Sequence, residues 1–405
     1  MENKWLRAAI PALLIHCSIG TVYCWSTFKE AIANQIGVST FATGWAFSFA
    51  IFFLGMSAAF AGRFVEQDIH KSSLIACICF TTGMIGTGLS IQFLHGVYAL
   101  IGIYVFYGCI MGIGLGVGYL TPVKTLMLWF DDQKGLATGI SIMGFGMAKA
   151  IATPIMEFLQ NTTSISAMFY VLGGAYFVMM FCGHMLLKKP EGWIESAETN
   201  QSFNVKAFIK KKRFILIWLM FYINIHCGLM LISYEKQILQ VYLNGILIAI
   251  IPSLTALSNA AGRLGYSTLS DKMKDRLTVY KIIFSSCMVV GVITFFFMSF
   301  SPYAYLIIIC MIALLLIVNL GYGGGFSTLP ALLSQYFGME NISKIHGLAL
   351  SAWAIAGITG NNTSEVILKC SHQNYSLIVL TAVVLYMIAF RITIELKKEW
   401  RTYER

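Results

Sequence analysis

The sequence predicts an all-α membrane protein with twelve transmembrane helices, arranged as two parallel-related halves of six helices each. Three observations predict this class: an apolar composition, twelve apolar runs of spanning length, and an internal repeat. Of the 405 residues, 58% are apolar and 11% are charged, and the mean hydropathy is +0.74. Soluble domains carry about 25% charged residues. The few charges present cannot cover a soluble surface, and the same composition excludes intrinsic disorder.

Each predicted span is a run of about 20 mostly apolar residues, the length that crosses the hydrocarbon core as a helix. The runs are long and continuous, which favours helices over the alternating ten-residue segments of barrel strands. The twelve runs lie near residues 8–28, 41–62, 73–93, 98–128, 136–160, 166–187, 214–234, 244–266, 279–300, 303–334, 345–368 and 375–394.

The distribution of lysine and arginine predicts the orientation. With the N-terminus in the cytoplasm, 22 of the 28 cationic residues lie in cytoplasmic loops and tails, three at outer ends and three inside spans. Positive charge is enriched on the cytoplasmic side of membrane proteins, so both termini are expected in the cytoplasm. The protein itself is expected in the cell membrane, of the bacterial inner-membrane type. The net charge of +10 is an orientation signal, and no nucleic-acid partner is expected.

The longest polar stretch, residues 188–213, divides six spans from six. It predicts an N-terminal half at 1–187, a cytoplasmic linker at 188–213 and a C-terminal half at 214–405. The linker carries seven lysines and arginines, in keeping with a cytoplasmic position. The transport unit is expected to be a monomer in the lipid bilayer.

An internal repeat supports this division. Residues 116–130 of the fourth span and 323–337 of the tenth are both glycine-rich at the start and end in an aromatic pair, and each run is followed by Gly-Leu-Ala, at 135–137 and 347–349. Both runs cross the membrane in the same direction, so the halves are parallel repeats. Two parallel six-helix repeats define the major facilitator architecture.

Five stretches carry a more specific resemblance. They are residues 20–28, 129–139, 144–146, 261–272 and 322–357. In order and in register with the spans, they resemble the oxalate–formate antiporter family of the major facilitators, which is related to monocarboxylate transporters. The resemblance implies a secondary transporter of small organic anions that works by alternating access. No cofactor or metal is expected, and no nucleophile–base pair indicates an enzyme.

Arg263 is the main candidate for substrate binding. It lies eight residues before Asp271, about 12 Å along the helix from the cytoplasmic loop, where an ionisable group costs about 2.5–3.5 kcal/mol. A guanidinium keeps its charge and offers a planar fork to a carboxylate. The resemblance implies the same role, because the arginine of the family's eighth helix holds a substrate carboxylate. The alternative is an interhelical hydrogen-bond anchor.

Lys149 is a second candidate, about 21 Å along the fifth span. Glu157, Glu235 and Glu365 all fall near outer ends of spans, so no carboxylate is expected to pair with it. Lys149 is therefore expected either to meet an anionic substrate or to be neutralised by burial. Lys124 lies close to the cytoplasmic end of its span and is expected to extend its ammonium to that surface.

The preference between substrates rests on one departure from the family. The family's oxalate exchanger holds its dicarboxylate between two cations, and the second is a lysine in the eleventh helix. The matching position here is Trp353, so a monocarboxylate is expected, with a dicarboxylate as the alternative if Lys149 compensates. The other predicted aromatic lining residues are Tyr23, Trp25, Tyr119 and Tyr322. Their polar groups can donate to a carboxylate while their rings contact its carbon skeleton; the alternative is packing.

Asn259 bears on how transport is coupled. Related proton-coupled monocarboxylate symporters often place an aspartate at this position, four residues before the arginine. Asparagine carries no proton, which favours exchange of one anion for another. His16 and His226 are the other deep titratable groups besides the lysines, able either to relay a proton or to pack as hydrogen-bonded residues. Proton symport and a non-transporting membrane sensor with the same fold are the alternatives.

Overall fold

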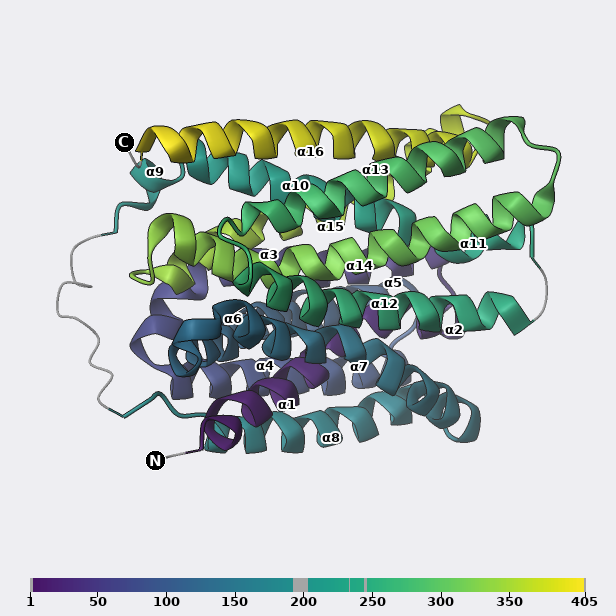
Figure 1. The fold of residues 1–405 in the computed structure, drawn as a ribbon. Coiled ribbons are helices and arrows are strands. Elements are labelled where there is room, and N and C mark those ends of the chain that lie inside the picture. Colours follow the sequence, from purple (N-terminus) through teal and green to yellow (C-terminus); the bar gives the residue numbers. More distant parts are fainter. Residues whose placement is uncertain (1–2, 192–202, 233, 244–245, 404–405) are drawn as a thin grey trace.

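The computed structural model describes residues 3–191, 203–232, 234–243 and 246–403, and consists of helices packed side by side (Figure 1). The N-terminal half contains a π-helical turn Trp5–Ala9, α1 Ile10–Ile19, a 3-10 segment Gly20–Cys24, α2 Trp25–Ile36, α3 Thr40–Gln67, α4 Ile69–Phe93, α5 Gly96–Ile103, a π-helical segment Tyr104–Met111, α6 Gly112–Trp129, a 3-10 turn Asp131–Gln133, α7 Lys134–Thr162 and α8 Ile165–Leu186. The C-terminal half contains α10 Lys212–Ile232, α11 Glu235–Gln240, α12 Ile246–Asp271, α13 Leu277–Phe300, α14 Ala304–Phe337, α15 Ile342–Cys370 and α16 Ser376–Tyr403.

Every predicted span coincides with one helix or with consecutive helical segments. In the described part of the chain, eleven such segments are long and apolar enough to cross a membrane by length and composition. The remaining predicted span, 244–266, corresponds to α12, a helix of 26 residues with the polar Asn259 and Arg263 in its interior. The predicted all-α membrane architecture is therefore confirmed.

The predicted linker, 188–213, falls partly on residues 192–202, which lie outside the described residues. The described remainder contains the short helix α9, Val205–Phe208, and the start of α10. At the other end of the linker, the Lys188 backbone N–H donates to the Arg7 carbonyl at 3.0 Å, and the Trp129 indole donates to the Lys188 carbonyl at 2.7 Å. These bonds hold the end of the N-terminal half together.

Polar residues explain where several helices begin. Ser39 and Ser164 each accept a hydrogen bond from the backbone N–H three residues later, at 3.1 Å, and so cap α3 and α8. Asp68 caps α4 by accepting from the backbone N–H groups of Lys71 and His70, at 2.9 and 3.0 Å. Such caps satisfy donors that the first turn of a helix leaves open. The same hydrogen bonds, from Lys71 first, lower the pKa of the Asp68 carboxyl.

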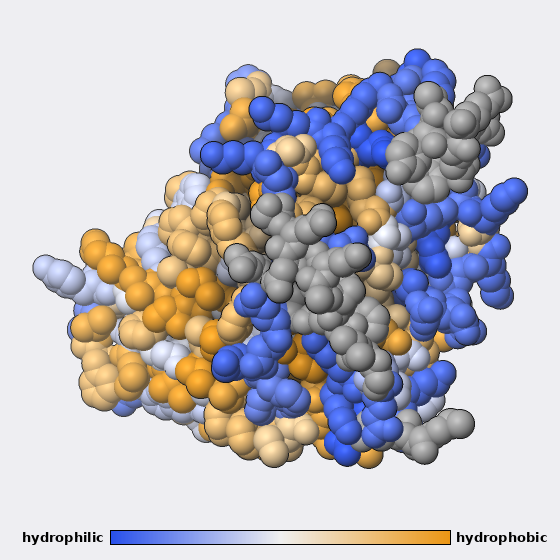
Figure 2. Space-filling model, turned by 90° about the vertical axis from the view of Figure 1, so that its left-hand side faces the viewer, coloured by the Kyte–Doolittle hydropathy of each residue, from blue (hydrophilic) through white to orange (hydrophobic). Residues whose placement is uncertain are grey.

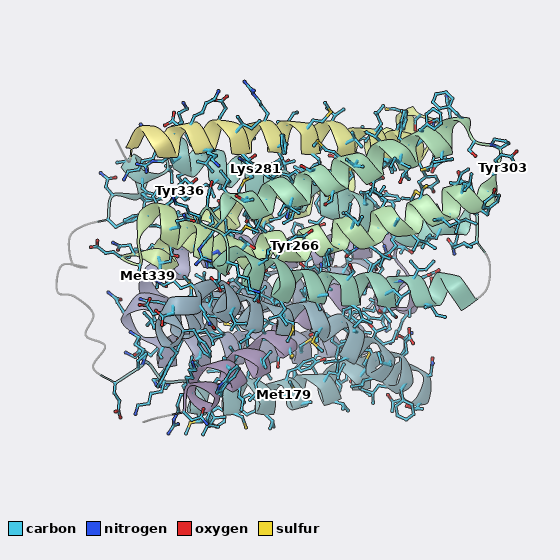
Figure 3. The ribbon with its side chains drawn as sticks, in the orientation of Figure 1. Met179, Tyr266, Lys281, Tyr303, Tyr336 and Met339 are labelled. Carbon is cyan, nitrogen blue, oxygen red and sulfur yellow. The ribbon has the colours of Figure 1, made fainter. Side chains whose placement is uncertain are left out.

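The two ends of the bundle can be told apart. Both ends of the chain lie at one end, which we call the terminal end (Figure 1). Figure 2 looks onto the terminal end and shows polar residues gathered there beside apolar flanks. Tyr336 and Met339 lie toward the terminal end and Tyr303 lies at the opposite end, which we call the far end (Figure 3).

The halves lie side by side and meet mainly through two helix pairs, α3 with α15 and α7 with α12. Glycine makes both crossings possible. A Cβ at Gly135 would lie 2.1 Å from the Ser267 carbonyl oxygen, and a Cβ at Gly347 would lie 2.1 Å from that of Ala58. The two Gly-Leu-Ala segments of the internal repeat thus mark equivalent points of close approach, where only a small residue fits.

One carboxylate clasps the halves together at the terminal end. Asp271 accepts hydrogen bonds from the backbone N–H groups of Gly135 and Leu136 at 2.8 and 2.7 Å, and Arg276 donates to it at 2.7 Å. A negative charge at the start of α7 is favourable because the first N–H groups of a helix point outward. In the other half, Asp68 caps its own helix α4. Among the described residues, the hydrogen bonds of Asp68 therefore stay within its own half, unlike those of Asp271.

We predict that Asp271→Asn weakens closure of the terminal end by about 1–3 kcal/mol, the usual cost of losing hydrogen bonds to a charged group. Spin labels placed on α7 and α12 near the terminal end would report this as a larger population at long distance in pulsed EPR. Asp275→Asn is the control, because Asp275 pairs with Lys397 of the same half at 3.7 Å. Equal distance distributions for wild type and Asp271→Asn would contradict the prediction.

Candidate functional site

A cavity of about 190 Å³ lies between the two halves. Its lining includes Lys29 of α2 and Glu235 of α11, two helices that lie toward the far end (Figure 1). A second hollow of about 320 Å³ shares Lys29, Gly44 and Ser48 with the cavity. That hollow continues to the end of α15 at Lys369. The cavity therefore opens toward the far end, while the terminal end is clasped.

Five of the eight predicted binding residues line this cavity. They are Tyr23, Trp25, Lys149, Asn259 and Tyr322. The hydroxyls of Tyr23 and Tyr322 lie 2.9 Å apart and form a hydrogen bond between the halves. The indole N–H of Trp25 has no hydrogen-bond partner among the described residues. The predicted lining from both halves is thus brought together.

Arg263 lies one helical turn beyond Asn259 on α12 and is fully buried, with 0% of its surface exposed. Its Nε donates to the Asn259 side-chain oxygen at 2.8 Å, and its Nη1 donates to the Ile142 carbonyl at 3.3 Å. Its Nη2 finds no hydrogen-bond partner among the described residues. The guanidinium carbon lies 5.5 and 5.4 Å from the ring centres of Phe145 and Phe326, a cation–π arrangement.

The charge of Arg263 has no described counter-ion. None of the ion pairs between described residues involves it. A buried charge without a partner is costly, so an anion that reached it would be bound strongly. Gly146 makes room for the side chain, since a Cβ there would lie 2.9 Å from both Cδ and Nε of Arg263.

The other two predicted residues, Tyr119 and Trp353, lie in a buried aromatic layer outside the cavity lining. The Trp353 ring lies 5.7 Å from Tyr119, 5.7 Å from Phe145 and 4.5 Å from Phe326, measured between ring centroids. The Trp353 indole N–H and the Tyr119 hydroxyl have no hydrogen-bond partner in the described part of the chain. Tyr119, Trp353 and Arg263 share Phe145 as a neighbour, and Trp353 and Arg263 also share Phe326. The predicted site therefore has two levels, an open cavity and a closed layer.

One expectation about the lysines is wrong, and it concerns Lys124. Lys149 forms no ion pair with a described carboxylate, as expected, although Glu235 lines the same cavity and is only 5% exposed. Thr255 donates to the Glu235 carboxylate at 2.7 Å. Glu235 begins α11, which packs against α12 and α14, so the carboxylate lies in the interior although the apolar run ends there. Lys124, which was expected to extend its ammonium to the cytoplasmic surface, is instead packed inside the bundle with 7% exposure.

The two histidines lie among hydrogen-bonding groups. The His16 ring nitrogens lie within hydrogen-bonding distance of the carbonyl oxygens of Ser141 and Tyr119, which joins α1 to α7 and α6. His226 Nδ1 lies 3.0 Å from the Thr359 hydroxyl. Neither residue lines the cavity. This arrangement agrees with the packing interpretation of both residues.

A bundle of membrane-crossing helices in two halves, with a cavity between the halves, is the architecture of the major facilitator transporters. The sequence profile of the Major Facilitator Superfamily matches residues 12–361. The chain therefore belongs to the Major Facilitator Superfamily.

Individual relatives agree with this assignment. The chain is 25% identical over 369 residues to the uncharacterized MFS-type transporter YhjX of Escherichia coli K12, covering 88% of this chain and 86% of the relative. It is 24% identical over 379 residues to the oxalate:formate antiporter of Oxalobacter formigenes, covering 91% and 85%. The solved structure of the proton:xylose symporter XylE matches with a TM-score of 0.75 at 13% identity, over 96% of this chain and 94% of that one. The predicted resemblance and fold are confirmed.

We predict that Gly146→Ala lowers transport about tenfold or more, because the new methyl group displaces the Arg263 side chain and small misplacements of binding groups have large effects. Uptake of the protein's substrate into proteoliposomes would measure this. Gly265→Ala on α12, the helix that carries Arg263, is the control, since a Cβ at Gly265 meets nothing within 4 Å. Wild-type uptake by the Gly146→Ala protein would show that the position of Arg263 is unimportant.

Proposed function

We propose that this protein is a secondary transporter of small organic anions, monocarboxylates in preference to dicarboxylates, and that it exchanges one anion for another. The observation that carries the proposal is Arg263, a fully buried cation between the halves with an unused Nη2 donor and no described carboxylate partner. A carboxylate is the anion that a guanidinium fork fits best among small organic groups. The name of the Oxalobacter formigenes relative, an oxalate:formate antiporter, supports a carboxylate substrate.

The preference for one carboxylate follows from the surroundings of Arg263. Its neighbours are the aromatic rings of Phe145, Phe326 and, through them, Trp353. Such a wall favours an apolar or hydroxylated tail. Three donors, Arg263 Nη2, Trp353 Nε1 and Tyr119 Oη, are free of partners among the described residues. In the proposed bound state they surround a single carboxylate, while Asn259 holds the guanidinium in position.

The proposed transport cycle begins with the conformation described above, open at the far end. Bound anion moves from the cavity past the Tyr23–Tyr322 hydroxyl pair to Arg263. The far end then closes and the Asp271 clasp opens, as halves 1–187 and 214–405 rock about the site. In the proposed orientation both termini are cytoplasmic in a cell membrane, and one chain is the transport unit.

Exchange follows from the same buried charge. An empty site leaves the buried Arg263 cation uncompensated, and closing the cavity beside it moves this charge still further from water, which costs free energy. A bound carboxylate removes most of this cost. The loaded protein therefore changes conformation more readily than the empty protein, which couples the export of one anion to the import of another.

Proton symport is the second candidate, and Glu235 favours it. A carboxylate inside the cavity is a group able to bind and release a proton during the cycle, a role that Asn259 cannot fill. Its hydrogen bond from Thr255 and its proximity to Lys149 would then change with each turnover. The two candidates differ in whether substrate is needed on both sides of the membrane.

We predict that uptake of labelled formate, acetate, lactate, pyruvate or oxalate requires proteoliposomes preloaded with a carboxylate. Preloading supplies an internal anion, and its export brings the binding site back to the outer side of the vesicle. The rate of uptake should therefore be at least about tenfold higher than with empty vesicles. Equal uptake into empty vesicles under an inward proton gradient would instead establish the symporter. Uptake of none of these anions under either condition would refute the proposed substrate class.

We predict that Arg263→Ala lowers carboxylate uptake at least about 100-fold, in line with the 2–5 kcal/mol lost when one partner of a buried charge pair is removed. Arg263→Lys keeps the charge but not the fork, and is expected to retain less than a tenth of the activity. Arg391→Ala is the control, because that side chain is exposed and pairs only along its own helix with Glu395. Wild-type uptake by Arg263→Ala would show that arginine is only a structural anchor.

A further inference from the structure

We propose that Glu235 sets the charge selectivity of the binding site. By compensating the Lys149 ammonium, it leaves Arg263 as the single uncompensated cation and so limits the substrate to one carboxylate. This inference rests on the proposed function and deepens it. It assigns a specificity role to a residue that no motif in the sequence singles out.

Lys149 and Arg263 are neighbours in the site. Gly146 packs directly against the Arg263 side chain, and Lys149 lies three residues further along α7, about 4.5 Å along the helix axis. Lys149 lines the cavity. Arg263 lies one helical turn beyond Asn259, which is itself a lining residue. Two free cations one helical turn apart would suit a dicarboxylate, with one carboxylate on each cation.

Glu235 removes the second of these cations from use. It lines the same cavity as Lys149, from α11 of the other half. Thr255 on α12 donates to Glu235 Oε1 at 2.7 Å, which fixes the carboxylate in place. With 5% exposure, Glu235 is poorly screened by water. In its ionised form, the carboxylate therefore acts on the cavity with little attenuation.

The balance of charge in the cavity supports this role. Among the described lining residues, Lys29 and Lys149 are the cations and Glu235 is the carboxylate. Lys29 belongs to α2, which lies toward the far end, and Glu30 follows it directly in the sequence. Each lining lysine thus has a glutamate nearby, and the described glutamates leave Arg263 without one.

A dianion would meet two obstacles at this site. Its second carboxylate would find Lys149 already compensated, and it would be repelled by Glu235. Discrimination against a substrate by repulsion is a common basis of specificity. A monocarboxylate held on Arg263 meets neither obstacle, because it directs an uncharged tail toward the cavity.

The test is the ratio of oxalate to lactate uptake by Glu235→Gln in preloaded proteoliposomes. Glutamine keeps the size of the side chain and an oxygen for Thr255, but frees Lys149. We expect the ratio to rise about tenfold, the effect of one charge-assisted hydrogen bond gained by the dianion. Glu235→Asp keeps the charge and is the matched control, with the wild-type ratio expected. An unchanged ratio in Glu235→Gln would overturn the inference.

A second variant keeps the test decisive if Glu235→Gln transports poorly. The double variant Lys149→Gln/Glu235→Gln lacks both charges. If the second carboxylate of oxalate binds Lys149, the oxalate-to-lactate uptake ratio of this variant should return to within about twofold of the wild-type ratio. A ratio that stays high in the double variant would overturn the inference. Failure of the proposed function is distinct, since it would appear as absent carboxylate uptake in the wild-type protein.

Discussion

A buried positive charge without a fixed partner is the constraint around which this molecule is organised. Arg263 lies in the interior of α12, at a depth where an isolated charge costs several kcal/mol. Two of its nitrogens are held by Asn259 and the Ile142 carbonyl, and one is left over. The protein tolerates this group because two aromatic faces and two hydrogen bonds offset part of the cost. A substrate that carries a negative charge offsets the rest of this cost.

The architecture places the Arg263 charge between the two halves, which can move apart. The halves meet at glycine crossings where backbones approach closely, and the Asp271 carboxylate clasps them at the terminal end. Midway along the spans 5–36 and 304–337, the Tyr23–Tyr322 hydroxyl pair is a single neutral hydrogen bond between the halves. Charge-assisted hydrogen bonds are about twice as strong as neutral ones. The Asp271 clasp therefore holds the terminal end closed more strongly than the tyrosine pair holds the halves together.

Much of the fold follows from sequence because membrane helices are specified locally. Apolar length defines a span, and a repeated Gly-Leu-Ala segment indicates the parallel halves; the structure has helices at all twelve positions. The arginine was identifiable for the same reason, since a charge in an apolar run stands out. Tyr23, Trp25 and Tyr322 were found from the patterned stretches. Lys149 was found as a charge deep in an apolar run, and Asn259 from its position four residues before Arg263.

What the sequence could not reveal depends on packing between distant segments. Glu235 follows an apolar run and so resembles an exposed end residue, but α11 packs on α12 and α14 and buries it. Tyr119 and Trp353 are closed off from the cavity because this conformation stacks them with Phe145 and Phe326. Lys124 is buried at 7% exposure although its position near a helix end suggested a path to solvent. In each case neighbours from another part of the chain decide the outcome.

The most direct test of the central claim is the thermal stability of the purified protein with carboxylates and with their uncharged amides. A ligand that binds the folded state raises the Tm, and the shift grows with the logarithm of ligand concentration above the Kd. If the substrate supplies the counter-ion of Arg263, one or more of formate, acetate, lactate and pyruvate raises the Tm in a concentration-dependent way, and the matching amide does not. Equal shifts from the acid and its amide, or no shift with any of them, would contradict the account.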